Sequence, residues 1–180
     1  MLLSHTAQRE GELLTFLRGE LALSSGLVKR LKWQNAFFLD GAPVHTNARV
    51  KPGQEITVRI EEAPEGFLPQ ALPIDILYED AYMIALDKPA GQLVHPSPRK
   101  NEGTLANALL GYYERTDQPC GIHPVTRLDR DPFGVVLLAK NAHIHAKLCQ
   151  LMKDGAIHKT YLASVFGCPE QPGLNCAAGL

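Results

Sequence analysis

The stretch EEAPEGFLPQAL, at residues 61–72, divides this chain into two unequal parts. It is rich in Pro and Glu and offers no apolar period for a helix or strand, which is typical of a linker. The chain has 180 residues, enough for one good core and a smaller appended unit. We therefore expect a first domain over 1–60, a linker over 61–72 and a second domain over 73–180.

The first part predicts two helices followed by short strands. In the segment GELLTFLRGEL, one helical face collects Leu13, Leu14, Phe16, Leu17 and Leu21. Ser24 or Ser25 can cap a second helix, whose inward residues are Leu27, Val28 and Leu31. Asp40-Gly41 lies between two extended runs and predicts a hairpin. Pro52-Gly53 forms the next turn, before the alternating Ile56, Val58 and Ile60.

A basic helix face stands out in this first part. Lys29, Arg30 and Lys32 lie opposite the apolar face of the second helix, and residues 1–60 hold eight Lys/Arg against five Asp/Glu. The stretch LSSGLVKRLKWQNAFFLDGAPVHTNARVKPGQEITV resembles the alpha-L motif, a small α/β RNA-binding domain of a ribosomal small-subunit protein and of tyrosyl-tRNA synthetases. The resemblance implies that these three residues contact RNA phosphates. A solvated basic face is the alternative that the charges alone leave open.

The second part predicts an α+β arrangement in which strands dominate. The runs ILYED and MIALDKP predict two strands with a turn at Glu79-Asp80, and Thr104 can cap a helix over 105–113. A buried strand is expected over Val135 to Ala139 and an amphipathic helix over Ala142 to Asp154. The run KTYLASVFG, at residues 159–167, predicts a closing strand.

Several classes of protein are excluded by what the sequence lacks. It contains no GxxxxGK[ST], GxGxxG, GxSxG or HExxH motif, and no apolar run long enough to span a membrane. The N-terminus lacks the pattern of a secretory signal. The four cysteines, Cys120, Cys149, Cys168 and Cys176, show no CxxC spacing, which favours a reducing cytoplasm.

The charged loop before the buried strand is the best candidate for chemistry. Arg127, Asp129, Arg130 and Asp131 fall within five positions of VTRLDRDPFGVVLLAKN. Neighbouring guanidinium groups keep a carboxylate ionised, which suits a nucleophile or base, and they argue against a metal-binding DxD pair. His143 and His145 lie on different faces of a helix and make a poor ligand pair. An ionised carboxylate can serve glycosidic chemistry, but a hydrolase needs a second acid at a defined separation, and the sequence offers no compelling partner for Asp129 in that role.

Three ordered motifs resemble the RluA-type pseudouridine synthases. TRLDRDPFGVVLLAKN is similar to the family signature HRLDRDTSGLLLLAKN, LDKPAGQLVHPS to NKPAGLLVHP, and KTYLASVFG to KxYxALVxG. The resemblance covers roughly residues 73–167. It implies an α+β fold in which the small domain precedes a mixed, mainly antiparallel synthase sheet with flanking helices.

Carried over to this sequence, the resemblance implies the following site. Asp129 is the catalytic aspartate, Arg127 takes the place of the flipped nucleotide in the RNA stack, and Tyr161 lies against the base; a core strand aromatic is the plainer interpretation of Tyr161. Arg130 joins Lys29, Arg30 and Lys32 as an RNA contact. The expected partner is rRNA or tRNA, with no metal, cofactor or membrane and with a monomeric protein.

Two departures from the family pattern affect these expectations. Thr126 replaces a frequent His, a tolerable change because a small polar side chain can still form a hydrogen bond, whereas Pro132-Phe133 replaces Thr-Ser and fixes φ while adding bulk. The family's later GRxHQIR-type motif is missing. We therefore expect an incomplete sheet, a fragment of a longer reading frame, and a 180-residue chain that is inactive or poorly folded by itself. The alternative is a non-catalytic RNA-binding protein with a degenerate or truncated synthase domain.

Overall fold

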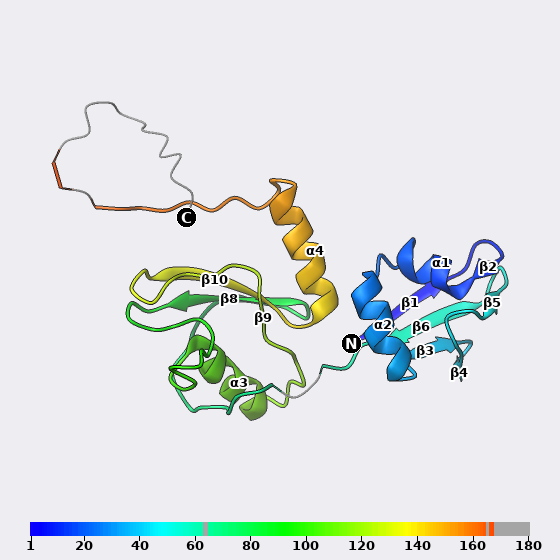
Figure 1. The fold of residues 1–180 in the computed structure, drawn as a ribbon, viewed down its shortest axis with the longest axis horizontal. Coiled ribbons are helices and arrows are strands. Elements are labelled where there is room, and N and C mark those ends of the chain that lie inside the picture. The colour runs from blue at the N-terminus through cyan, green and yellow to red at the C-terminus, as the bar shows by residue number, and fades with distance from the viewer. Residues whose placement is uncertain (63–64, 165, 168–180) are drawn as a thin grey trace.

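The computed structural model describes residues 1–62, 65–164 and 166–167, and it contains two four-stranded sheets (Figure 1). The first part of the chain holds β1 (Leu2–Thr6), β2 (Gly11–Glu12), α1 (Leu13–Arg18), α2 (Ser25–Trp33), β3 (Phe37–Leu39), β4 (Ala42–Pro43), β5 (Arg49–Val50) and β6 (Glu55–Arg59). The second part holds β7 (Asp75–Glu79), β8 (Met83–Lys88), α3 (Leu105–Arg115), β9 (His123–Pro124), β10 (Gly134–Ala139) and α4 (Ala142–Lys153). Every strand pairing in the described part is antiparallel, so the fold is α+β, without the parallel pairs that a mixed sheet would contain.

The first sheet has the strand order β1-β6-β3-β4, and α1 and α2 pack against it. The inward residues predicted for α2 are buried together with Phe16, Phe37 and Ile56 in one apolar cluster. Ser24 is the cap of α2, because its hydroxyl accepts a hydrogen bond from the Leu27 amide at 3.2 Å. The helices, the hairpin at Asp40-Gly41 and strand β6 are thus confirmed.

Strand β1 was not expected from the sequence. It pairs with β6 in register from Leu2 opposite Arg59 to Thr6 opposite Glu55, and only every second residue is partly covered. The run LLSHT has no clear alternation of apolar and polar residues, so its extended form comes from pairing with a strand some fifty residues away in the sequence.

The second sheet has the order β7-β8-β10-β9, and α3 covers one of its faces (Figure 1). A second apolar cluster forms where Ile84, Leu86, Val136 and Leu138 of the two central strands meet α3. The turn between β7 and β8 is closed by Asp80, whose carboxylate accepts hydrogen bonds from the Tyr82 and Met83 amides. The strands predicted from ILYED, from MIALDKP and over Val135 to Ala139 are confirmed, and so is the helix that begins after Thr104.

Residues 65–72 have neither helix nor strand, yet they are bound to α3. Gln70 donates its amide hydrogen to the Asn107 carbonyl, and the Asn107 side chain donates to the Leu68 carbonyl at 2.8 Å. Asn107 also completes a reciprocal cap with Thr104 at the start of the helix. The division of the chain into domains stays a prediction, but residues 65–72 of the expected linker pack against α3.

The closing strand predicted from KTYLASVFG is not formed. Residues 158–164 are not assigned to a helix or strand, and Tyr161 and Leu162 are exposed. A strand needs a neighbouring strand to take up its amide and carbonyl groups, and this segment leaves the end of α4 without pairing with either sheet in the described structure (Figure 1). Val165 of this run, and the C-terminal residues 168–180 with Cys168 and Cys176, lie outside the described residues.

Within the described residues, no helix combines the length and apolar character needed to cross a bilayer.

Candidate functional site

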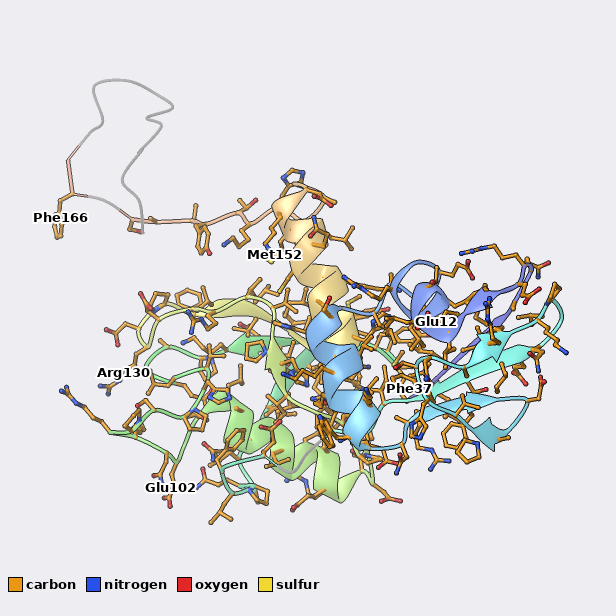
Figure 2. All side chains as sticks on the ribbon, turned by 45° about the vertical axis from the view of Figure 1, so that its right-hand side comes forward. Glu12, Phe37, Glu102, Arg130, Met152 and Phe166 are labelled. Carbon is orange, nitrogen blue, oxygen red and sulfur yellow. The ribbon has the colours of Figure 1, made fainter. Side chains whose placement is uncertain are left out.

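A cleft of about 1200 Å³ opens between the loop that joins β9 to β10, the segment 93–97 and the end of α4. The loop contributes Arg127, Asp129 and Arg130, while Lys159 and Tyr161 line the cleft from the segment after α4. Figure 2 shows that Arg130 and Met152, which also line it, come from the loop and from α4 respectively. Four residues predicted from sequence as site residues are therefore brought to one cleft by two distant segments.

Asp129 is solvent-exposed on this loop. None of the ion pairs among the described residues includes Asp129, Arg127 or Arg130, so the flanking guanidinium groups do not form direct ion pairs with the carboxylate. The Arg130 side chain instead donates a hydrogen bond to the Gly91 carbonyl at 3.3 Å. The carboxylate of Asp129 is left free to meet a ligand in the cleft.

The loop is fastened to β10 at its start. The Thr126 hydroxyl accepts a hydrogen bond from the Leu137 amide at 2.9 Å, and the Val125 amide donates to the Leu137 carbonyl at 2.8 Å. The expectation that a small polar residue at position 126 can still form a hydrogen bond is confirmed. Leu128 adds an apolar anchor, since it packs against the buried cluster of the second sheet.

Lys88 also holds this loop in place, and the sequence analysis did not identify this role. Its side chain is fully buried, and its ammonium donates to the carbonyl oxygens of Pro89, Gln92 and Arg130 at 3.0, 2.9 and 3.0 Å. Three acceptors use all three ammonium hydrogens. The signal was present in the sequence, because Lys88 is the lysine of the LDKPAG motif.

Burial lowers the pKa of Lys88, and the nearby Asp131 carboxylate opposes that change by favouring the charged form. The charge of Asp131, the second acid of the charged loop, thus favours the ammonium form of Lys88.

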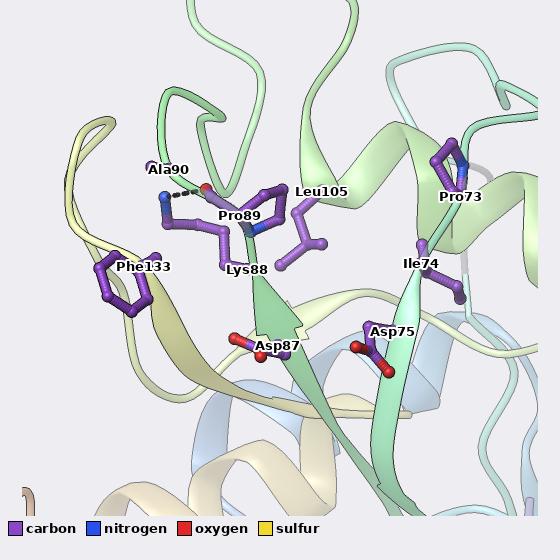
Figure 3. Close-up of a pocket in the computed structure, with 9 residues that line it drawn as sticks. All are labelled: Pro73, Ile74, Asp75, Asp87, Lys88, Pro89, Ala90, Leu105 and Phe133. Atoms are coloured by element: carbon purple, nitrogen blue, oxygen red, sulfur yellow. Dashed lines mark hydrogen bonds between the residues drawn. The ribbon is translucent and has the colours of Figure 1, made fainter.

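Pro132 and Phe133 separate two surfaces. Pro132 lines the cleft, whereas Phe133 is 76% exposed and lines a neighbouring groove of about 450 Å³ (Figure 3). That groove also holds Asp75 and Asp87, which lie opposite each other on β7 and β8. The bulk of Phe133 therefore lies in a groove separate from the cleft that Asp129 lines.

Gly134 ends the loop with φ at +118°. This backbone conformation is strained for residues with a side chain, which explains the glycine between the charged loop and β10.

The three basic residues of α2 are not equivalent. Lys29 and Lys32 are exposed and absent from the ion pairs of the described residues. Arg30 points instead toward the second part of the chain, with its Nη2 atom 3.6 Å from a carboxylate oxygen of Glu62. This geometry supports a role for Lys29 and Lys32 in contacting a free anion more strongly than one for Arg30.

Glu62 joins the two parts of the chain. Its carboxylate accepts a hydrogen bond from the Ala142 amide at the start of α4 (3.1 Å) and contacts the His123 ring at 3.0 Å, in addition to facing Arg30. Burial is the largest influence and raises the pKa of Glu62, but the His123 and Ala142 hydrogen bonds and the charges of His123 and Arg30 together outweigh it. The net result is a lowered pKa.

The two histidines of α4 lie in different environments. His143 is buried, and burial followed by the charge of Lys147 lowers its pKa. His145 contacts the Pro124 carbonyl at 3.2 Å. Over the described residues, no three His, Cys, Asp or Glu side chains gather closely enough to hold a metal ion.

Comparison with known proteins identifies the family. A family model described as RNA pseudouridylate synthase matches residues 82–178. The chain is 32% identical over 152 residues to YjbO, an uncharacterized RNA pseudouridine synthase of Bacillus subtilis, covering 83% of this chain and 54% of that protein. It is 33% identical over 130 residues to the ribosomal large subunit pseudouridine synthase D of Pseudomonas aeruginosa, covering 72% of this chain and 41% of that protein.

A third relative, YhcT, is another uncharacterized RNA pseudouridine synthase of Bacillus subtilis. It is 34% identical over 125 residues, or 69% of this chain and 41% of that protein. The chain spans about half the length of the curated relatives it matches. The matched region contains the cleft loop and β10.

Proposed function

The chain belongs to the RNA pseudouridylate synthase family, and from this premise we propose that the protein isomerises specific uridines of rRNA or tRNA to pseudouridine, with Asp129 as the catalytic residue. In this reaction the bond between the ribose C1′ and the uracil N1 breaks, the base turns, and C1′ bonds to C5. The proton of C5 is lost and N1 gains one, so the reaction is an isomerisation. The reaction requires a group beside C1′ that stabilises developing positive charge, and an ionised carboxylate is such a group.

The observation that carries this proposal is the placement of Asp129. Its loop is tied to β10 by Thr126 and to the buried ammonium of Lys88, and it opens into the largest cleft described above. A carboxylate on an anchored loop keeps its position when a substrate enters, and this preorganisation is what catalysis by charge stabilisation needs.

The other residues of the cleft fit the same reaction. Arg127 is exposed beside Asp129, where its planar guanidinium could fill the stack left by a flipped uridine. Arg130 and Lys159 add positive charge for phosphate contacts, and Tyr161 faces the cleft from the opposite segment. We propose that Tyr161 lies against the turned base.

The test maps pseudouridines across cellular RNA in a strain that lacks the gene. At least one position should lose its pseudouridine, and the unmodified gene should restore it. The Asp129→Asn gene should not, because losing the catalytic group slows such steps by at least about 100-fold. Asp131→Asn is the matched control and should restore the modification.

Restoration by Asp129→Asn would overturn the catalytic assignment. If no position changes in the deletion strain while the protein still binds RNA, the alternative of a non-catalytic RNA-binding protein holds instead.

A further inference from the structure

Trp33, the last residue of α2, is 84% exposed, and it is the only tryptophan of the chain. Successive residues of an α-helix are turned by about 100°. Trp33 therefore lies on the side of α2 opposite the buried Leu27, Val28 and Leu31, between Lys29 and Arg30. The most exposed side of the helix thus carries its largest apolar side chain.

Nothing within the described structure accounts for this side chain. None of the aromatic pairs or cation–π contacts of the described residues involves Trp33. The position gains nothing from helix propensity either, since Trp is a poorer helix former than Lys, Glu or Gln. A scattered exposed apolar residue is ordinary, but a solvent-facing indole flanked by cations forms a defined chemical surface.

The neighbouring charges decide which ligand suits that surface. Lys29 precedes Trp33 by one helical turn, whereas Lys32 is its neighbour in the sequence and lies about 100° further round the helix. Both lysines are exposed and absent from the ion pairs of the described residues. A free ammonium group one turn from a flat ring, with a second further round the same helix, matches a phosphate backbone that carries unpaired bases. In a duplex the bases are already stacked on one another and offer the indole no open face.

We propose that Trp33 is a stacking platform for an unpaired base of the RNA substrate, with Lys29 and Lys32 holding the flanking phosphates. This inference deepens the proposed function and rests on RNA being the substrate. It places a single-stranded segment of the substrate on α2, away from the cleft that holds Asp129.

The single tryptophan makes the test direct, because its fluorescence reports Trp33 alone. Binding of a short unpaired RNA oligonucleotide of mixed sequence should quench this fluorescence in step with the fluorescence anisotropy of a dye-labelled copy. A duplex of the same sequence should bind more weakly and quench less. Trp33→Ala should weaken binding of the unpaired strand by about 10-fold, and Trp33→Phe should retain most of the affinity.

Salt dependence separates stacking from charge. Trp33→Ala should leave the slope of log affinity against log salt unchanged, whereas the double variant Lys29→Gln, Lys32→Gln should reduce that slope by about 1.4. Tyr82→Ala removes another exposed aromatic side chain, from the turn between β7 and β8, and serves as the control that should change neither quantity. The exposure of Trp33 means that its variants keep the fold, which circular dichroism checks.

Several results would overturn the proposal. These are RNA binding without quenching, equal quenching by duplex and single strand, unaltered affinity of Trp33→Ala, or no RNA binding at all. If the fluorescence falls as the protein concentration rises and RNA does not reverse the change, Trp33 belongs to a self-association surface. If anionic vesicles cause the quenching and RNA does not reverse it, Trp33 belongs to a lipid-binding surface. Asp129→Asn should leave the quenching intact, so failure of this inference is distinguishable from failure of the catalytic proposal.

Discussion

Lys88 is a buried cation whose partners are all backbone carbonyl oxygens. Charged groups are seldom fully buried unless every hydrogen-bonding position is satisfied. Here the three carbonyls come from the segment after β8 and from the loop of Asp129, so one side chain ties these two loops together. By binding the Arg130 carbonyl, Lys88 fixes the backbone of the loop that carries Asp129.

Replacing Lys88 by Met should therefore destabilise the protein. The change leaves the carbonyl oxygens of Pro89, Gln92 and Arg130 without this charged donor and should lower the free energy of unfolding by about 3 kcal/mol. Urea denaturation measures this loss. Lys100→Met, at an exposed lysine, is the control and should stay within about 0.5 kcal/mol of the unmodified protein; an equal effect of the two changes would contradict the role given to Lys88.

At the scale of elements, α3 is held from outside by the segment 65–72. A Cβ atom added at Gly111 would lie 2.3 Å from the Gln70 carbonyl oxygen, whereas one added at Gly26 in α2 would meet nothing within 4 Å. Both glycines lie within helices, so the two positions share the same preference for alanine and differ in what surrounds them.

The two glycines predict opposite changes in stability. Gly111→Ala should lower the free energy of unfolding by about 2 kcal/mol, because it pushes the 65–72 segment off the helix. Gly26→Ala should raise it by about 0.5 kcal/mol through helix propensity. Thermal unfolding of both variants measures the difference, and a stabilised Gly111→Ala protein would show that the segment is not packed as described.

The elements also differ in how far the sequence predicts them. The helices that begin at Ser25 and Leu105 have a capping residue and an apolar face within a dozen residues, so local pattern suffices. The sequence misleads in opposite ways for β1, a strand that was not predicted, and for the run KTYLASVFG, a predicted strand that is not formed. The first is extended because β6 pairs with it, and the second has strand composition but no strand beside it in the described structure. Strand formation depends on a distant partner, which composition does not encode.

At the scale of the whole molecule, the two parts of the chain meet at Glu62. Its carboxylate bridges Arg30 of α2 to His123 and to the start of α4. Since the pKa of Glu62 is lowered in the folded protein, the folded state binds this proton less readily than the unfolded chain does. The stabilisation is therefore complete above the ordinary pKa of about 4.5, and it is lost as the pH falls below that value through the lowered pKa.

Glu62→Gln should test this junction. At neutral pH the variant should be less stable by about 2 kcal/mol, because a charge-assisted acceptor is lost, and it should show a smaller further loss below pH 4.5 than the unmodified protein. Stability measured by denaturant at several pH values gives both quantities. Glu61→Gln, at the exposed neighbouring residue, should follow the unmodified protein; if it matches Glu62→Gln instead, the effect is one of net charge.

The sequence by itself determined the local features and the family. Caps, turns and apolar periods lie within single segments, and the motifs around Asp129 retain their order, so both can be predicted without coordinates. Only the tertiary structure decided which side chains meet. It turned Arg30 toward Glu62 and left Lys29, Lys32 and Trp33 in solvent, and it brought Tyr161 to the cleft of Asp129. It also placed the Lys88 ammonium among carbonyls up to 42 positions away in the sequence. The physical reason is that such contacts depend on how separate elements pack, and no single segment carries that information.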